Sequence, residues 1–238
     1  FKFDADRLIH LASLNSELKE SDIKKEVSLS SNAIKCMKAL KCKKMIFFSS
    51  IKVYGDNSFE FKKFDEDSLL GPLCFYGEAK KQCEEFINQK SKDNSFDYII
   101  FRLPPLLINH PQSNLGKIFK FIDRGWPMPS FKIGDLNQRS FLSYELLLEI
   151  LISITADIHI LKNEVINLSI SHTLSTNNLY KMIGAQLKKK VKIIYLPDFI
   201  FSLMMRVNKL QLLLCRLFGN LYISNEKLKN KFPHSKNL

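Results

Sequence analysis

The chain has 238 residues, 45% of them hydrophobic, and its 36 lysines and arginines outnumber its 24 aspartates and glutamates, which gives a formal net charge of +12. This composition excludes a disordered or fibrous protein and allows one large or two small domains with a buried core. The positive charge suits an anionic ligand, but no zinc-finger spacing, aromatic RNA-binding motif or basic zipper indicates nucleic acid.

The cysteine spacing and the apolar runs indicate in which compartment of the cell the protein is expected. The five cysteines form no CxxC pair, which favours free thiols in the cytoplasm, and the five histidines are isolated, so we expect no metal site. No apolar run is long and uncharged enough for a transmembrane segment. The segment 196–218 is predicted to form buried helices, and its basic residues Arg206, Lys209 and Arg216 leave a weak contact with a membrane surface as the alternative.

The first half of the sequence alternates between strand and helix patterns. The stretch "DRLIHLAS" predicts a buried strand that ends in a loop, and "KKMIFFSS" and "FDYIIFRL" predict two more, the last stopped by Pro104 and Pro105. Helices are expected over 22–41 and 75–90, with a loop over 56–74. Strands and helices at these intervals predict an α/β fold with a parallel sheet and right-handed crossovers.

The pattern changes after about residue 110. The stretch "NLGKIFKFIDRGWPMP" predicts a helix followed by a Gly/Pro stop, "EVINLSI" predicts a short strand, and the chain from 174 onward is expected to be mostly helical. We therefore expect a smaller α/β part that packs on the sheet, not a separate domain.

Three polar residues are predicted to meet at one edge of this sheet, because the carboxyl ends of parallel strands lie together. Ser50 ends one strand, and Tyr76 and Lys80 lie one turn apart on the helix that follows. A nearby ammonium lowers the pKa of a phenol, and a serine hydroxyl can hydrogen-bond a substrate oxygen. Such a group suits acid–base catalysis of an alcohol–ketone interconversion, in which a cofactor must take the hydride.

The stretches "SSIKVYG", "YGEAK", "FRLPPLLI" and "NQRSFLSYE" together resemble the NAD-dependent epimerase/dehydratase family, the extended short-chain dehydrogenases that act on nucleotide sugars. The resemblance covers nearly the whole chain. It implies a Rossmann-like doubly wound parallel sheet whose N-terminal strands are missing. Residues 1–110 would be the C-terminal portion of the NAD-binding domain, and residues 111–238 mainly the substrate-binding part, with some segments returning to the sheet.

The resemblance also implies roles for individual residues. Tyr76 would be the catalytic acid/base, Lys80 would hold the nicotinamide ribose and tune Tyr76, and Ser50 would assist at the reacting oxygen of the substrate. The other residues implied to border the cofactor, NAD or alternatively NADP, are Leu11, Ala12, Ser49, Leu103 and Pro104. The others implied to contact a nucleotide-diphosphate sugar are Asn114, Arg139 and Arg216. For Asn114, a helix cap for "LGKIFKF" remains the competing interpretation.

The sequence departs from the family pattern in two places. The family has an asparagine in the helix before the serine strand, and here that position is expected at Leu29, or at Asn32 after a shift. The acidic residue that follows the Arg-Ser-Phe segment is present as Glu145. The eight glycines cannot form the GxxGxxG turn that receives a dinucleotide pyrophosphate. About 60 residues, two strand–helix units, are therefore expected to be missing, which indicates a fragment of a longer enzyme or a decayed open reading frame.

The favoured hypothesis is a cytoplasmic UDP-sugar 4-epimerase of surface-polysaccharide biosynthesis, which oxidises its substrate to a 4-keto sugar and reduces it again. One alternative is an NAD(P)H-dependent reductase of 4-keto-sugar nucleotides. An alternative of another class is a non-catalytic remnant that no longer binds NAD. A homodimer is left open, and no nucleic-acid partner is expected.

Overall fold

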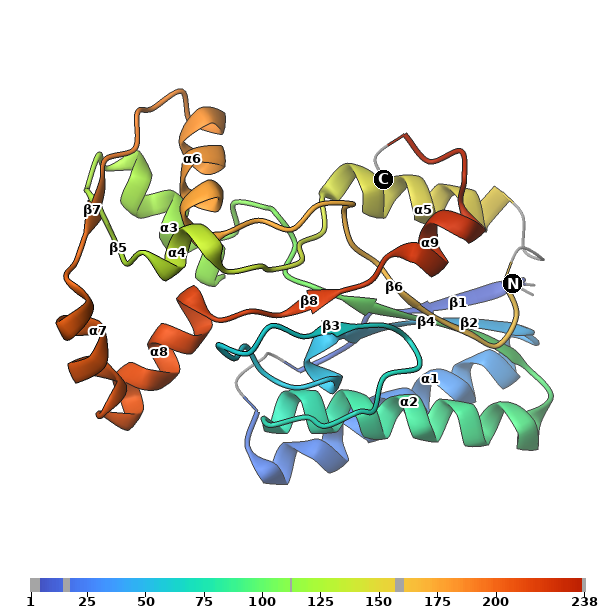
Figure 1. Ribbon diagram of the computed structural model, residues 1–238. Coiled ribbons are helices and arrows are strands. Elements are labelled where there is room, and N and C mark those ends of the chain that lie inside the picture. The colour runs from blue at the N-terminus through green and yellow to red at the C-terminus, as the bar shows by residue number, and fades with distance from the viewer. Residues whose placement is uncertain (1–4, 15–17, 112, 157–160, 237–238) are drawn as a thin grey trace.

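The computed structural model describes residues 5–14, 18–111, 113–156 and 161–236. Its centre is a four-stranded parallel sheet (Figure 1). The strands, in the order in which they lie side by side, are β1 (Arg7–His10), β2 (Lys44–Ser50), β4 (Asp97–Leu103) and β6 (Glu164–Asn167). Ser50 pairs with Leu103, so β2 and β4 end at the same edge. The predicted α/β fold with a parallel sheet is confirmed.

Helices cover both faces of this sheet, which makes it doubly wound (Figure 1). On one face lie α1 (Ile23–Ala39) and α2 (Phe75–Asn94), and on the other lie α5 (Tyr144–Ala156) and α9 (Glu226–Lys231). Successive side chains of a strand point to opposite faces. Met45 and Phe47 accordingly pack into the core under α1 and α2, while Ile46 packs into the core under α5.

Local contacts at their ends define the helices α1 and α2. The Cys74 sulfur accepts a hydrogen bond from the Gly77 amide and so caps α2, which ends at Ser95 in a left-handed conformation. A short 3-10 turn, η1 (Glu20–Asp22), leads into α1. The buried side chains of α1 recur at spacings of three and four, which places them on one face toward α2 and the sheet.

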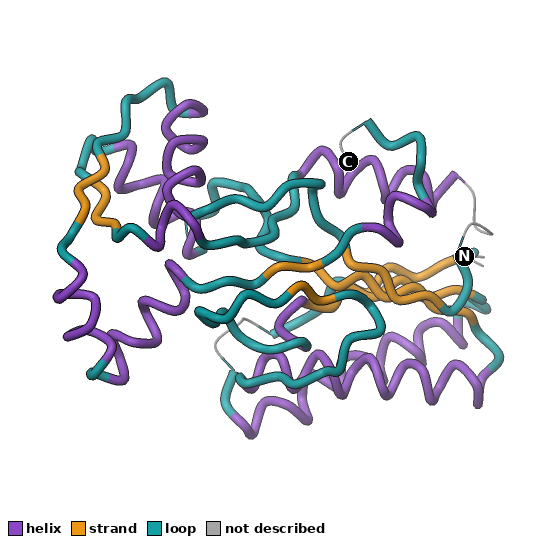
Figure 2. Tube along the Cα trace, in the orientation of Figure 1, coloured by secondary structure: helices purple, strands orange, loops and turns teal. Residues whose placement is uncertain are grey.

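A second group of elements lies beyond the carboxyl edge of the sheet (Figures 1 and 2). Its members are α3 (Asn114–Asp123), β5 (Met128–Ser130), α4 (Ile133–Leu136), α6 (Thr176–Gln186), β7 (Ile193–Tyr195), α7 (Asp198–Met205) and α8 (Asn208–Phe218). A separate two-stranded ribbon joins β3 (Lys63–Phe64) to β8 (Tyr222–Ile223), and the 3-10 turn η2 (Ile51–Val53) follows β2. The predicted boundary near residue 110 stays a prediction.

Four short strands correct the sequence-based expectations. β3 lies within the predicted loop 56–74, β5 begins within the predicted Gly/Pro stop, and β7 and β8 interrupt the region expected to be helical. Each of these strands has only two or three residues and pairs with a strand distant in the sequence, so no local periodicity could predict it. Among the described residues, no helix is long and apolar enough to cross a bilayer.

Candidate active site

Ser50 and Tyr76 meet at the carboxyl edge of the sheet. Ser50 is the buried last residue of β2, and its hydroxyl accepts a hydrogen bond from the Lys52 amide at the start of η2. Tyr76 lies in the first turn of α2, where its phenol and the Ser50 hydroxyl are hydrogen-bond partners. A strand end and a helix start thus bring two hydroxyl groups together, as the sequence predicted.

Gly77 explains how α2 comes so close to the strand end. A Cβ atom at this position would lie 2.4 Å from the Lys52 carbonyl oxygen and 3.0 Å from the Pro72 side chain. Only a glycine allows the first turn of α2 to lie against the backbone of η2 in this way. The glycine of "YGEAK" therefore sets the approach of Tyr76 to Ser50.

Lys80 lies one turn further along α2 and is almost completely buried, with 2% of its surface exposed. Its Nζ atom lies 2.9 Å from Glu26 Oε1, 5.0 Å from the centre of the Phe47 ring and 5.7 Å from the centre of the Tyr76 ring. The predicted proximity of Tyr76 and Lys80 is therefore present. The ion pair with Glu26, however, was not predicted.

Tyr76 is held in its phenol form. Burial raises the pKa of Tyr76, the Glu26 carboxylate raises it further, and the hydrogen bond with Ser50 lowers it, with a result of about 12. The sequence led us to expect a lowered pKa from the neighbouring ammonium. The shift has the opposite direction because burial outweighs the other effects and because the charge of Lys80 is compensated by Glu26.

A buried polar network lies beside these residues. Arg102 Nη2 lies 2.7 Å from Glu84 Oε2, and Arg102 Nη1 donates to the Tyr54 hydroxyl at 2.8 Å. That hydroxyl donates to Asn167 Oδ1 at 2.8 Å, which links β4 to the end of β6. The hydroxyl of Ser49, a predicted cofactor residue, donates to the Glu84 carboxylate. Ser49 thus joins this network in the structure, and not the Ser50–Tyr76 pair.

The remaining predicted cofactor residues follow β1 and β4. Leu11 and Ala12 are exposed in the loop after β1. Leu103 ends β4 and is half-buried, and Pro104 after it is buried. These strands are parallel to β2, so the four residues lie along the edge that carries Ser50.

Arg139 is the predicted anion-binding residue, and it is partly enclosed. Its Nη1 donates to the Leu217 carbonyl oxygen at 3.4 Å, and its guanidinium lies 5.2 Å from the centre of the Phe141 ring. Burial lowers the pKa of Arg139 to about 10, so it stays charged at neutral pH. Within the described part of the chain, no carboxylate lies at ion-pair distance from Arg139, which suits it to an incoming anion.

The other two predicted substrate residues are more exposed. Asn114 is the exposed first residue of α3, and the cap of that helix is Ser113, whose hydroxyl accepts from the Gly116 amide at 2.9 Å. The interpretation of Asn114 as a helix cap is therefore wrong. Arg216 is exposed on α8, next to the Leu217 whose carbonyl oxygen meets Arg139.

Glu26 is the functional candidate that the sequence analysis missed. Leu29 is half-buried and Asn32 is exposed, whereas Glu26 is the α1 residue that pairs with Lys80. A signal was available, because Glu26 lies four residues before Ser30 and eight before Ile34 on the buried face of α1. A carboxylate on the apolar face of a helix requires a buried partner.

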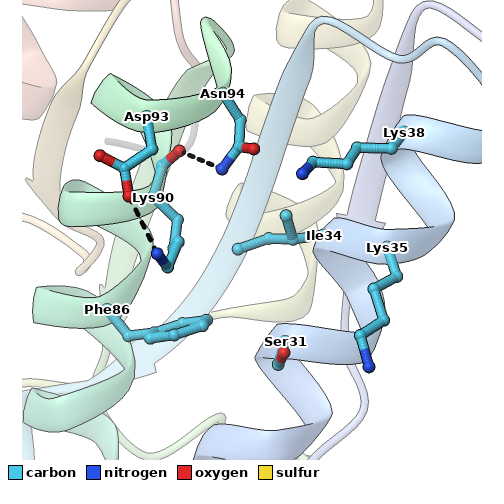
Figure 3. Close-up of a pocket in the computed structure, with 8 residues that line it drawn as sticks. All are labelled: Ser31, Ile34, Lys35, Lys38, Phe86, Lys90, Asp93 and Asn94. Carbon is cyan, nitrogen blue, oxygen red and sulfur yellow. Dashed lines mark hydrogen bonds and ion pairs between the residues drawn. The ribbon is translucent and has the colours of Figure 1, made fainter.

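A shallow groove between α1 and α2 lies apart from these residues (Figure 3). Ile34 and Phe86 form its apolar part, and it is lined besides by Ser31, Lys35, Lys38, Lys90, Asp93 and Asn94. None of the predicted catalytic, cofactor or substrate residues lines it. Among the described residues there is also no cluster of potential metal ligands.

The residues at this edge fit one end of a nicotinamide dinucleotide. Hydroxyl groups at Ser50 and Tyr76 and the apolar surface of Leu103 and Pro104 suit the nicotinamide and its ribose. Lys80 is covered and paired with Glu26, so it faces Tyr76 from inside the protein. The glycine-rich turn for the pyrophosphate is not among the 238 residues.

A doubly wound parallel sheet with Ser50, Tyr76 and Lys80 at its carboxyl edge defines an α/β protein of the Rossmann-like class. The model of the NAD dependent epimerase/dehydratase family matches residues 1–156, which is more than half of the chain. The chain therefore belongs to this family, and the resemblance inferred from its motifs is confirmed.

Individual relatives agree with this assignment. The chain is 26% identical over 183 residues to the UDP-glucose 4-epimerase of Vibrio cholerae, in an alignment that covers 76% of the chain and 55% of that protein. It thus spans about half the length of this curated relative. Among solved structures, the UDP-glucuronic acid 4-epimerase of Bacillus cereus superimposes with a TM-score of 0.74 at 19% identity, covering 99% of this chain and 70% of the other. The RMD protein of Pseudomonas aeruginosa superimposes with a TM-score of 0.69 at 14% identity, covering 95% of this chain and 74% of the other.

Proposed function

We propose that this chain carries the acid–base residues and part of the substrate site of a UDP-sugar 4-epimerase. The observation that supports this most is the Ser50–Tyr76 hydroxyl pair, backed by the buried Lys80, at the sheet edge where ligands of such folds bind. The proposed cofactor is NAD, with NADP as the alternative. When bound, its nicotinamide would supply the group that accepts a hydride and later returns it.

In this proposal, Tyr76 in its phenolate form, the minor form at neutral pH, receives the proton of the sugar 4-hydroxyl during oxidation, and as a phenol it returns the proton during reduction. The Ser50 hydroxyl hydrogen-bonds the same 4-oxygen and orients it toward Tyr76. Arg139 binds the diphosphate, which holds the sugar end of the substrate at the sheet edge. The 4-keto sugar turns over while it stays bound, so that its other face receives the hydrogen in the second step.

A 4-keto-sugar reductase is the second candidate, and the high pKa of Tyr76 favours it. A phenol that keeps its proton at neutral pH is ready to donate to a ketone but poorly prepared to act as a base. The two candidates differ in the fate of the cofactor. A reductase releases one oxidised cofactor for each product molecule, whereas an epimerase regenerates its cofactor in every turnover.

The finer elements of this function remain proposals. A role in surface-polysaccharide biosynthesis rests on the likeness of "SSIKV" and "RLPPLLI" to bacterial members of the family. A cytoplasmic location is supported by the free thiols of all five cysteines. A remnant that binds a nucleotide sugar without catalysis is the alternative of another class, because the 238 residues contain no GxxGxxG turn for a dinucleotide.

The replacement of Tyr76 tests the proposed chemistry. In the active enzyme, Tyr76→Phe removes the proton carrier, and we expect turnover of UDP-sugars to fall by about 10² to 10⁴ with little change in UDP affinity. Tyr144→Phe is the matched control, because Tyr144 is an exposed tyrosine on α5. Near-normal turnover of Tyr76→Phe would exclude Tyr76 from the mechanism.

A weak contact with a membrane surface is a secondary proposal. Phe199 and Leu203 on α7 and Leu212 on α8 are exposed, and the basic residues Arg206 and Lys209 lie between them in the sequence. We expect a fraction of the protein to sediment with vesicles that contain anionic lipid and none with neutral vesicles. Complete retention in the supernatant with both would contradict this contact.

A further inference from the structure

Glu26 is a buried carboxylate with three partners. Its Oε1 atom lies 2.9 Å from Lys80 Nζ and accepts from the Ser13 hydroxyl at 2.5 Å, and its Oε2 atom accepts from the Leu14 amide at 2.8 Å. Both Glu26 and Lys80 have about 2% of their side-chain surface exposed. The loop after β1 and the helix α2 are thus joined through one residue of α1.

The surroundings of this ion pair contain few other charges. His10 on β1 hydrogen-bonds Ser30 at 3.2 Å, and its pKa is lowered by burial and by the charge of Lys80, so it is neutral at physiological pH. Burial also raises the pKa of Cys83 to about 11, so this thiol is neutral too. Glu84, one turn after Lys80, is paired with Arg102. Glu26 is therefore the counter-charge of Lys80.

The location of this counter-charge matters for Tyr76. The Lys80 ammonium is ion-paired with Glu26 and lies 5.7 Å from the centre of the Tyr76 ring. An unpaired ammonium at this place would stabilise a phenolate, but the carboxylate paired with it cancels much of its field. The other groups that act on Tyr76 are Ser50, which favours the phenolate, and Cys74, which opposes it.

We propose that Glu26 is a positioning residue that holds the Lys80 ammonium under Tyr76 and, by compensating its charge, keeps Tyr76 protonated. The proton affinity of the proposed acid/base is then set by a residue of α1 that does not touch it. The inference rests on the proposed function only for its catalytic meaning. The electrostatic coupling itself concerns residues within this chain and needs neither cofactor nor substrate.

The test is a titration of Tyr76 in the 238-residue chain without ligands. The phenolate fraction of Tyr76 is measured by the NMR signal of carbon-13-labelled tyrosine, assigned by its loss in Tyr76→Phe. At pH about 10, the ordinary tyrosine pKa, the wild-type residue should be mostly phenol. In Glu26→Gln, the loss of the carboxylate charge should lower the midpoint by about one pH unit or more and raise the phenolate fraction roughly tenfold.

Two further variants separate charge from structure. Glu84→Gln removes another buried carboxylate, the partner of Arg102, and should leave the Tyr76 titration unchanged even if the protein is less stable. Glu26→Asp keeps the charge with a shorter side chain, so its midpoint should stay close to that of the wild type. An equal shift in Glu84→Gln, or no shift in Glu26→Gln, would overturn the proposal.

These measurements stay informative if the Glu26→Gln variant does not fold or if the proposed function is wrong. If Glu26→Gln does not fold, the wild-type chain can still contradict the proposal, because a Tyr76 midpoint below about 10 would show that Tyr76 is not kept protonated. If instead Tyr76→Phe proves fully active, the proposed function fails while the coupling of Glu26 to Tyr76 is still measured. Turnover and titration therefore report on the two hypotheses separately.

Discussion

Arg139 keeps its charge in a partly enclosed place, where its contacts are a carbonyl oxygen and an aromatic ring. Such an environment stabilises a guanidinium poorly, as the lowered pKa indicates, because desolvation is not offset by a neighbouring carboxylate. An arriving diphosphate would supply the missing negative charge and two hydrogen-bond acceptors. The residue is therefore prepared to gain more from an anion than an exposed arginine would.

We expect Arg139→Leu to weaken the binding of free UDP by about 1.5–3 kcal/mol, the usual contribution of a charge-assisted hydrogen bond. Calorimetric titration of the chain with UDP measures this change directly. Arg206→Leu on the exposed end of α7 is the control for a general loss of positive charge and should bind UDP as the wild type does. Equal affinities of Arg139→Leu and wild type would make Arg139 a structural residue.

At the residue scale, local motifs predict the partners that lie close in sequence. The spacing of Tyr76 and Lys80 and the strand end at Ser50 placed these three residues correctly next to one another. The ion pair of Lys80 with Glu26 joins residues 54 positions apart on two helices, and no short motif encodes such a contact. The direction of the Tyr76 pKa shift depends first on burial and then on the Glu26 carboxylate, so the pKa decrease expected from the motif had the wrong sign.

Among the elements, the contact between α2 and η2 controls the candidate site. The backbone of α2 at Gly77 lies so close to the Lys52 carbonyl that an added Cβ would clash at 2.4 Å. A backbone carbonyl cannot rotate away as a flexible side chain can, so a larger residue forces the helix and the turn apart. Tyr76 precedes Gly77 and would move with the helix.

We expect Gly77→Ala to destabilise the protein by about 1–3 kcal/mol, the usual effect of overpacking, although alanine is otherwise the better helix former. Thermal or urea unfolding measures the loss. The Tyr76 titration should change as well, because the Ser50 hydroxyl no longer meets the phenol. Gly71→Ala is the control, since its Cβ would find only the Tyr54 carbonyl oxygen at 3.9 Å. A stable Gly77→Ala variant with a normal titration would contradict this account.

The larger elements were predictable from sequence because their patterns are long. The strands β2 and β4 each contain an uninterrupted apolar stretch at their centre, and α1 and α2 carry apolar residues at helical spacing. The pairs β3–β8 and β5–β7 form only after the chain has brought distant segments together. Strands of two or three residues have no periodicity of their own, so tertiary contacts decide whether they form.

At the scale of the whole molecule, two surfaces besides the exposed apolar residues of α7 and α8 could join copies of the chain, namely the outer edge of β1 and a stripe on α5. Among the described strands, β1 pairs only with β2, and its other edge carries no strand. On α5, Leu148 is 39% and Ile152 is 65% exposed, and Tyr144 lies one turn before them on the same helix face. Unpaired strand edges and apolar stripes are surfaces on which copies of a chain associate.

We therefore expect the 238-residue chain to bind NAD only weakly and to associate as its concentration rises. The nicotinamide end of the site is built from residues present here, but no GxxGxxG turn is available for the pyrophosphate, which normally contributes much of the affinity of such a site. Calorimetry with NAD and light scattering over a concentration series measure the two properties. Micromolar NAD affinity, or turnover of UDP-sugars by this chain, would contradict the first expectation.

Added positive charge tests the second expectation, that copies of the chain associate as the concentration rises. The double substitution Leu148→Lys and Ile152→Lys places two ammonium groups on the exposed stripe of α5, where they repel the same stripe of another copy, and it should reduce the scattering mass. Leu69→Lys is the matched control, because Leu69 is 91% exposed in the loop before α2, far from α5 in the sequence. If association persists equally in both variants, the β1 edge or the exposed apolar residues of α7 and α8 carry it. A chain that stays monomeric at every concentration would show that neither surface is adhesive.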